Sequence, residues 1–234
     1  SDAICSNENA LLPFIAVDHE GGYVHRFGSL ATQLPAPGAF YSLVKEKDFE
    51  YAIESIQTAA LLSGRELKTM GINMNLAPVA EILDNTNEAF LESRSYGDNA
   101  LFVTKASSAF MQGMQNAGIA CAMKHFPGNT HIDPHVAISR IEKSRAELDQ
   151  DIMAFAYAIR EELPAAIMVS HAVIETVDPQ KPASLSKKIM QSWIKDSLSF
   201  EGIIISDDFR MKAISLSGYS PEAAIIEALE SGAD

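Results

Sequence analysis

Ionisable and polar side chains occur in short groups, and each group ends a short apolar run. The groups are Asp18-His19-Glu20, Ala77-Pro78, Lys124-His125, Ser170-His171 and Asp207-Asp208. Carboxylate, imidazole and ammonium groups gathered in one pocket can bind a polar ligand and exchange protons with it. Single residues also have structural interpretations, since Glu20 could pair with Arg26 and His171 could be a hydrogen-bonded core histidine. Five groups in equivalent places favour one shared site.

A carboxylate stands two residues before a histidine in Asp133-Pro134-His135. An aspartate that accepts a hydrogen bond from one imidazole nitrogen fixes the tautomer, and the other nitrogen can then exchange a proton. With Asp207 as a carboxylate nucleophile, this pair would supply the parts of a retaining glycosidase. Two other interpretations stay open. Zinc or non-haem iron could bind to His125, His131, Asp133 and His135, although their spacing fits no compact metal motif. Alternatively, the histidines could belong to a solvated loop without a function.

Several other functions lack their sequence signals. The chain has no Gly-x-Ser-x-Gly elbow, no Gly-x-x-x-x-Gly-Lys loop and no Gly-x-Gly-x-x-Gly turn, which disfavours the corresponding hydrolases, nucleotide hydrolases and dinucleotide enzymes. A formal net charge of −13 disfavours a nucleic-acid or anionic-membrane surface. No apolar run reaches the roughly 18 to 20 residues of a membrane span, and 1–9 lacks the regions of a signal peptide. We expect a cytoplasmic protein, with secretion, a periplasmic location or lipoprotein anchoring still open because an N-terminal part is expected to be missing.

Apolar runs alternate with segments of helical periodicity, and this alternation predicts the elements that position the polar groups. The runs are typical of buried parallel strands and comprise Leu12–Asp18, Asn73–Val79, Gly118–Phe126, Ala165–His171 and Gly202–Asp207. The periodic segments predict helices at Phe49–Met70, Ala100–Ala117, Arg145–Glu162 and Lys187–Ser197. Ligands of such α/β folds bind at the C-terminal ends of the strands, where the polar groups lie.

The end of the chain predicts one more helix and the approach to another strand. Ser220 is a helix cap, Pro221 stands at the first helical position, and Gly232 marks the stop. Ala233-Asp234 then lies where a strand should begin. We expect one domain over residues 1–234 that forms an incomplete (β/α)₈ TIM barrel, because five strands cannot close one.

Five blocks of the sequence resemble the motifs of glycoside hydrolase family 3, in particular its bacterial NagZ-type β-N-acetylglucosaminidases. They cover nearly the whole chain in the family's order. Residues 15–22 with Val24 and Arg26-Phe27 resemble "DQEGG…RF", and the others resemble "APV", "RSFG", "KHFPG" and "GFxGVVxSDDLxM": Asn75–Val79, Arg94–Gly97, Lys124–Gly128 and Phe200–Met211. On this alignment the chain comprises barrel strands 3 to 7 and the approach to strand 8.

The resemblance implies roles for eight residues. Asp207 would be the nucleophile that forms a covalent glycosyl-enzyme, His135 the acid/base, and Asp133 its partner. The sugar hydroxyls and N-acetyl group would be bound by Asp18, Arg26, Arg94, Lys124 and His125. His19 and Tyr23 replace the family's usual Gln and Arg, and the loop that ends in His135 is shorter, with Pro134 stiffening it. These departures affect the contacts beyond the first sugar and the reach of His135.

The resemblance implies a retaining exo-β-N-acetylglucosaminidase that releases terminal β-linked GlcNAc, with peptidoglycan fragments as the expected substrate. The partner would be a small carbohydrate, and no cofactor or metal is implied. A family 3 β-glucosidase, β-xylosidase or glycosyl phosphorylase stays open as an alternative, as does a catalytically silent sugar-binding module. The sequence predicts no oligomeric state.

Overall fold

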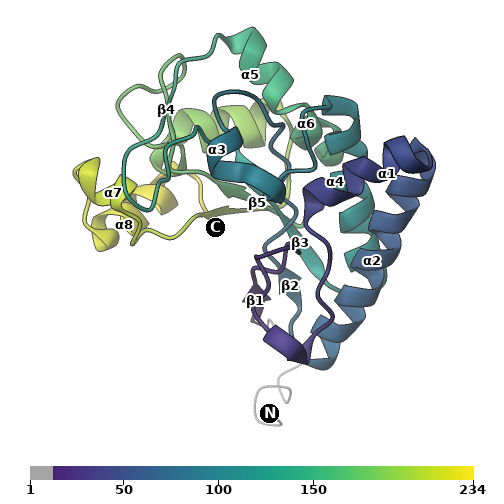
Figure 1. Ribbon diagram of the computed structural model, residues 1–234. Helices are drawn as coiled ribbons and strands as arrows, with labels where there is room; N and C mark the ends of the chain where they lie inside the picture. Colours follow the sequence, from purple (N-terminus) through teal and green to yellow (C-terminus); the bar gives the residue numbers. More distant parts are fainter. Residues whose placement is uncertain (1–12) are drawn as a thin grey trace, which may run out of the picture.

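The computed structural model describes residues 13–234, an α/β fold with five parallel strands in one sheet (Figure 1). The strands are β1 (Ala16–Val17), β2 (Met74–Asn75), β3 (Ala120–Phe126), β5 (Ala166–Val169) and β7 (Ile203–Ser206). Their order in the sheet, β1-β2-β3-β5-β7, follows the chain, so the strands wind in one direction as in a barrel. The predicted parallel sheet is therefore confirmed, and it forms a half-barrel. Leu12, the predicted start of the first strand, lies outside the described residues.

The sheet brings the C-terminal ends of all five strands to the same edge. Parallel pairing sets Val17 beside Asn75, Asn75 beside Cys121, and Val169 beside Ser206. The register shifts between Lys124 and Phe126, so β3 carries an irregularity at its polar end. Since every strand points the same way, the residues that follow the strands converge on one face of the half-barrel.

Helices pack on the outside of the sheet and close the core. Their bounds are α1 (Phe40–Glu46), α2 (Phe49–Thr69), α3 (Glu88–Leu91), α4 (Ala100–Asn116), α5 (Arg145–Asp151), α6 (Met153–Arg160), α7 (Lys212–Leu216) and α8 (Pro221–Ser231). Figure 1 shows α2 running beside α4, and the two helices contact each other along their length. Buried positions of α2 recur at helical spacing in Ala52, Ile56 and Ala60, which gives the helix one apolar face.

The core centres on aromatic side chains between the sheet and its helices. Phe126 meets Phe155 edge-on at a centroid distance of 5.3 Å and Trp193 at 5.1 Å. All three side chains are essentially buried. Burying an aliphatic or aromatic side chain of this size stabilises a fold by roughly 1.5 to 3 kcal/mol. This core holds the ends of β3 and β5 in place beneath the polar edge of the sheet.

Two predicted helices differ from the observed ones. The segment predicted as one helix over Arg145–Glu162 is divided into α5 and α6 at Ile152, whose φ of −87° and ψ of 8° leave the helical region. Residues Lys188–Ser197 form a π-helix in place of the predicted α-helix. Its wider turn is visible in the hydrogen bond from the Leu198 amide to the Trp193 carbonyl, five residues earlier. Hydrophobic periodicity does not distinguish these arrangements.

Several short elements have no counterpart among the predicted ones. A separate two-stranded parallel sheet joins β4 (Arg140–Ile141) to β6 (Val173–Ile174). Helices α1, α3 and α7 and four 3₁₀ turns lie in segments for which no helix was predicted. The turns are Gly28–Leu30, Pro37–Ala39, Glu92–Arg94 and Ala183–Leu185. All are five residues or shorter except α1, and elements of that length carry little periodic signal.

The predicted last helix is confirmed as α8. The Ser220 hydroxyl accepts a hydrogen bond from the Ala223 amide, and Gly232 ends the helix with a φ of 110°. The Asp234 amide then donates to the Ile204 carbonyl of β7 at 2.9 Å. Residue 234 therefore lies alongside β7, where the sequence predicted the approach to a further strand.

Among residues 13–234, no helix combines the length and the apolar character that crossing a membrane requires.

Candidate active site

A pocket of about 400 Å³ opens at the C-terminal edge of the sheet. Seven of the eight predicted site residues line it: Asp18, Arg26, Arg94, Lys124, His125, His135 and Asp207. Some stand at the ends of β1, β3 and β7. Arg26 and Arg94 lie in the segments between β1 and β3, and His135 lies in the segment between β3 and β7. The pocket is where the parallel sheet predicts a ligand site, because strand ends and free loop groups converge there.

The turn after β1 places Asp18 and Glu20 at the pocket. The side chain of Asn75 in β2 accepts from the His19 amide at 3.0 Å and donates to the His19 carbonyl at 2.9 Å. Gly21 has a φ of 101°, and a Cβ there would lie 2.5 Å from the Pro35 carbonyl oxygen. A side chain at that position would therefore push the turn away from the segment that covers it.

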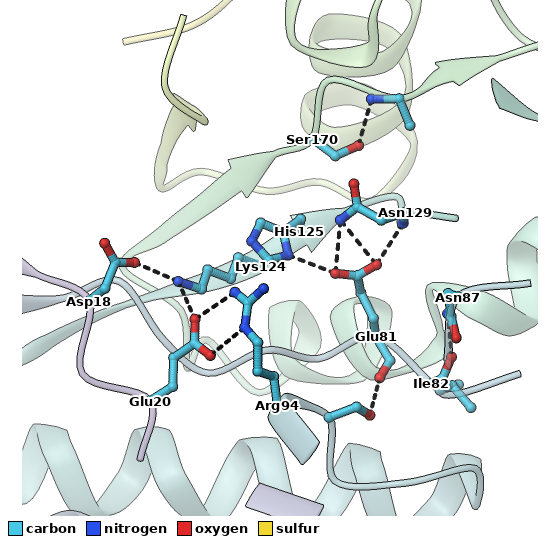
Figure 2. Close-up of polar contacts among 12 residues, drawn as sticks. Asp18, Glu20, Glu81, Ile82, Asn87, Arg94, Lys124, His125, Asn129 and Ser170 are labelled. Atoms are coloured by element: carbon cyan, nitrogen blue, oxygen red, sulfur yellow. Dashed lines mark hydrogen bonds and ion pairs between the residues drawn. The ribbon is translucent and has the colours of Figure 1, made fainter. Parts of the chain in front are cut away.

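An ion-pair network lies on one wall of the pocket (Figure 2). Lys124 Nζ is 2.6 Å from Asp18 Oδ1 and 2.7 Å from Glu20 Oε1. Arg94 approaches Glu20 in two-pronged fashion, with Nε 2.9 Å from Oε2 and Nη2 2.8 Å from Oε1. Burial alone would raise the pKa of Glu20, but Lys124 and Arg94 outweigh it and hold that pKa at about 2.

Glu20 is thus the internal counterion of the wall, and the suggested Glu20–Arg26 pair is wrong. Glu20 is 4% exposed, whereas Asp18 is 35% exposed at its side chain, so Asp18 is the carboxylate that a ligand can reach. Arg26 lines the pocket as an exposed residue. The wall offers a carboxylate that accepts from hydroxyls beside cationic donors, which suits a polar, neutral sugar.

His125 faces the pocket with its outer edge and is held from behind by Glu81. The Nδ1 atom of His125 lies 2.7 Å from Glu81 Oε1, and both side chains are nearly buried. The same carboxylate accepts from the Asn129 amide at 2.6 Å. Sequence reasoning missed Glu81, although an acidic residue close behind a predicted buried strand end was a usable signal.

The predicted Asp133–His135 pair is present in the loop after β3. His135 Nδ1 lies 2.7 Å from Asp133 Oδ1, which also accepts from the His135 amide at 2.8 Å. The side chain of His135 is 61% exposed and lines the pocket, while Asp133 lies behind it in a neighbouring groove. The Ala213 amide of α7 donates to the Pro134 carbonyl at 3.0 Å. The shortened loop therefore does bring His135 to the pocket that Asp207 lines.

Asp207 follows β7 directly and turns toward the pocket. Its amide donates to the Val169 carbonyl, which continues the pairing of β5 with β7 by one residue. Its Oδ1 accepts from the Asp208 amide at 2.8 Å. The Asp208 side chain instead pairs with Arg210 at 2.9 Å, and both of these side chains are largely exposed. The two adjacent aspartates thus have different surroundings, and Asp207 has no cation paired to it among the described residues.

His171 fits its structural interpretation. It is 1% exposed, with Nδ1 2.7 Å from the Ser184 hydroxyl and Nε2 3.1 Å from the Asp208 carbonyl. Burial lowers the pKa of His171, so the ring is held neutral at pH 7. It supports the backbone beside Asp207 and does not line the pocket.

The metal interpretation gains no geometric support from the part of the chain described. Residues 13–234 contain no cluster of three His, Cys, Asp or Glu side chains suited to a metal ion. The four candidate ligands do not lie together: Nδ1 of His125 is hydrogen-bonded to Glu81, whereas the other three residues line the neighbouring groove. These three are His131, Asp133 and His135.

A second hollow extends the pocket past the loop that carries Asp133 and His135. Tyr23, Phe90, Arg94 and His135 line both cavities, and the second has a volume of about 460 Å³. Tyr23 is 58% exposed, so its ring is available to a ligand. Sequence reasoning noted Tyr23 only as a departure from a motif and did not find Phe90, which stands in a short helix with no chemical signal.

Comparisons with known proteins agree with this architecture. The model of the "Glycosyl hydrolase family 3 N terminal domain" matches residues 3–234. A β-hexosaminidase from Thioalkalivibrio sulfidiphilus is 35% identical over 222 residues, which are 94% of this chain and 62% of that protein. β-Hexosaminidase A from Pseudoalteromonas piscicida is 31% identical over 94% of this chain and 39% of its own length.

Solved structures show the same fold. A glycoside hydrolase family 3 β-N-acetylglucosaminidase from Paenibacillus superposes with a TM-score of 0.85 at 34% identity, over 96% of this chain and 42% of that one. Native NagZ from Neisseria gonorrhoeae superposes with a TM-score of 0.84 at 29% identity, over 94% and 62%. The chain thus spans 39% to 62% of the length of these four relatives. By its sequence match over residues 3–234 and by its fold, the chain belongs to glycosyl hydrolase family 3, whose N-terminal domain it represents.

Proposed function

We propose that the protein to which this chain belongs is a retaining exo-β-N-acetylglucosaminidase that hydrolyses terminal β-linked GlcNAc from peptidoglycan fragments. The observation that carries the proposal is that Asp207 and His135, the latter bonded to Asp133, line one pocket with a sugar-binding wall. Relatives over most of this chain are named β-hexosaminidase, and a similar fold is that of a β-N-acetylglucosaminidase.

In the first displacement, an Asp207 oxygen attacks the anomeric carbon of the GlcNAc unit while the glycosidic carbon–oxygen bond breaks. His135, protonated on the nitrogen that faces the pocket, gives its proton to the departing oxygen. Asp133 stays hydrogen-bonded to Nδ1 and stabilises the imidazolium from which the proton leaves. The products are a free alcohol and a sugar esterified to Asp207.

In the second displacement, water replaces the alcohol. Neutral His135 takes a proton from the water as its oxygen attacks the anomeric carbon, and the bond to Asp207 breaks. GlcNAc leaves with the configuration that it had in the substrate, because two inversions restore it. The Asp207 carboxylate and the protonated His135 are both regenerated.

The ion-pair wall binds the sugar without adding net charge to it. Asp18 accepts hydrogen bonds from hydroxyl groups, Lys124, Arg94 and Arg26 donate to hydroxyl and N-acetyl oxygens, and His125 presents its outer ring nitrogen to the sugar. Because Glu20 already neutralises part of the cationic charge, Lys124 and Arg94 remain fixed in place when the pocket is empty. A wall held in place before binding loses little conformational entropy when the sugar arrives.

The imidazole at the acid/base position favours a second candidate, a glycosyl phosphorylase. His135 adds no negative charge next to Asp207 when it is neutral, so phosphate could approach the anomeric carbon in place of water. Both candidates share the first displacement. They differ in the product, which is GlcNAc for the hydrolase and a GlcNAc 1-phosphate for the phosphorylase.

The proposal is tested with the full-length protein and 4-nitrophenyl β-glycosides of GlcNAc, glucose and xylose, with and without inorganic phosphate. We expect release from the GlcNAc compound, with free β-GlcNAc as the first product seen by proton NMR. Faster release from the glucose or xylose compound would contradict GlcNAc as the substrate. A sugar 1-phosphate product would show that the enzyme is a phosphorylase and not a hydrolase. An α-configured first product would contradict a retaining mechanism.

A further inference from the structure

Glu81 joins segments that carry three of the pocket residues, two through its carboxylate and one through its main-chain carbonyl. One oxygen accepts from His125 Nδ1 and the other from the Asn129 amide, at 2.7 and 2.6 Å (Figure 2). The Ser95 hydroxyl, next to Arg94 in the chain, donates to the Glu81 carbonyl at 2.6 Å. Glu81 is 3% exposed and does not line the pocket. Glu81 therefore lies behind the pocket and contacts the residues that hold the pocket side chains in place.

The contact with His125 fixes what that residue presents to a ligand. A carboxylate accepts hydrogen bonds and does not donate them, so Nδ1 of His125 carries a proton. In the neutral ring, Nε2 is then left as an acceptor at the pocket, and in the protonated ring both nitrogens donate. Without Glu81 the ring could adopt the other tautomer or rotate, and its contact with the sugar would change.

The contact with Asn129 holds the root of the catalytic loop. Gly128 has a φ of 146° and is followed directly by Asn129, whose side-chain amide also donates to Glu81, at 3.1 and 3.3 Å. His135 is six residues farther along the same loop. Its far end is held by the hydrogen bond from Ala213 to Pro134. Glu81 is thus the anchor of the loop on the side that leaves β3.

We propose that Glu81 is a positioning residue that sets both the tautomer of His125 and the placement of the loop that carries His135. This inference rests on the proposed glycosidase function and deepens it, because one buried carboxylate couples sugar binding to proton donation. The role needs two acceptor oxygens. An amide in the same place has one acceptor oxygen and one donor nitrogen, so it can satisfy Asn129 and His125 together only if His125 adopts the other tautomer.

The test compares Glu81→Gln with the parent in the full-length protein, using GlcNAc aryl glycosides with a good and a poor leaving group. The 2,4-dinitrophenyl compound leaves without a proton, whereas the phenyl compound needs one from His135. We expect KM to rise for both compounds through His125. We expect kcat/KM, which reports the first displacement, to fall about 10²-fold for the phenyl compound, because the loop is misplaced, and much less for the dinitrophenyl compound.

Asp151→Asn is the matched control, since Asp151 is partly buried and pairs with Lys143 at 2.8 Å without contacting a pocket residue. It measures what loss of a comparable carboxylate does to folding alone. A ratio of phenyl to dinitrophenyl kcat/KM that changes only in Glu81→Gln supports the proposal. Equal losses for both compounds with KM unchanged, in proportion to the unfolded fraction, would overturn it.

A measurement on the unaltered protein covers the case in which Glu81→Gln does not fold. Nitrogen-15 NMR of the histidine rings, assigned with His125→Gln, reports which nitrogen of His125 carries the proton at neutral pH. We expect a protonated Nδ1, and an unprotonated Nδ1 would overturn the proposal. If the parent cleaves neither glycoside, the proposed function fails, while this NMR result still decides the part assigned to Glu81.

Discussion

Among single residues, the adjacent aspartates Asp207 and Asp208 differ in the partners of their side chains. Both line the pocket, but Asp207 has no paired cation among the described residues, whereas the Asp208 side chain is paired with Arg210. A nucleophile needs a carboxylate whose oxygen is free to approach a carbon atom. The geometry therefore favours Asp207 over its neighbour for covalent chemistry.

Replacing Asp207 by Asn should lower kcat/KM for a GlcNAc aryl glycoside by at least about 10³-fold, because an amide cannot form the glycosyl ester. Asp208→Asn, the matched control, should lower it by less than about tenfold, since that side chain is bound to Arg210. Steady-state kinetics and circular dichroism on both variants check this. Similar losses in the two variants would contradict the assignment.

Tyr23 belongs to the groove that extends the pocket, and an exposed aromatic ring suits the apolar face of a second sugar. Tyr23→Ala should reduce kcat/KM for a GlcNAc disaccharide about tenfold, with a smaller effect for methyl β-GlcNAc, while Tyr23→Phe keeps most of the activity. Tyr51→Ala is the control, because Tyr51 is also exposed but lies on α2. Equal losses for both substrates would exclude a contact beyond the first sugar.

The sequence predicted most of the residues that line the pocket, but not the buried residues that pair with them. Asp18, Lys124, His135 and Asp207 stand in recognisable motifs and line the pocket. Glu81 and the Glu20–Arg94 pair were not found, because their partners are 44 and 74 residues away in the chain. Only the register of the sheet brings such residues together, and local spacing carries no information about it.

At the scale of elements, the turn after β1 contains an unusual buried histidine. His19 is fully buried, and neither ring nitrogen has a hydrogen-bond partner among the described residues. Its ring lies 4.8 Å from that of His25. Burial and the nearby His25 lower the pKa of His19 to about 4, against a weaker opposing effect of Glu66. The turn that presents Asp18 and Glu20 is thus built on a neutral imidazole.

This histidine should make stability depend on pH. Between about pH 6.5 and 4 the unfolded chain protonates His19 and the folded chain does not, so the free energy of unfolding falls as the pH falls. The loss attributable to His19 is at most roughly 3 kcal/mol. Urea unfolding at several pH values should show a shallower decrease in His19→Gln than in the parent. Parallel curves for the two proteins would contradict the buried neutral ring.

Close packing of α2 on α4 depends on Gly113. A Cβ there would lie 2.3 Å from the Gln57 carbonyl oxygen and 2.7 Å from Ala60 Cβ. Gly113→Ala should therefore lower the free energy of unfolding by about 1 to 3 kcal/mol, although alanine favours helix formation. Gln112→Ala, at an exposed position of α4, should have little effect. Thermal or urea unfolding of both variants checks this, and a stabilised Gly113→Ala would show that the helices can move apart.

Element predictions were most reliable where a segment was long and periodic. Phe49–Met70 and Ala100–Ala117 agree with α2 and α4 within one residue at each end. The strands are shorter than predicted: β2 ends at Asn75, and after Leu76-Ala77-Pro78 the pairing resumes only as a single bridge between Val79 and Lys124. The division at Ile152 and the π-helix depend on tertiary packing, which periodicity does not report.

At the scale of the whole molecule, the winding of the sheet is what makes a site from distant residues. Each strand lies beside the previous one, so the groups at positions 18, 124 and 207 meet at one edge although they span most of the chain. The net charge of −13 produces a long-range field that repels polyanions and does not hinder the approach of neutral partners. This overall design agrees with a small carbohydrate ligand.

The proposed covalent bond between Asp207 and GlcNAc can be trapped and located in the protein. The full-length protein is incubated with a 5-fluoro N-acetylglucosaminyl fluoride, digested and mapped by mass spectrometry, with Asp207→Asn treated in parallel. We predict one added fluorinated sugar on the peptide that contains Asp207, and none in the variant. A sugar on another carboxylate, or none on a protein that nevertheless cleaves GlcNAc glycosides, would contradict the account.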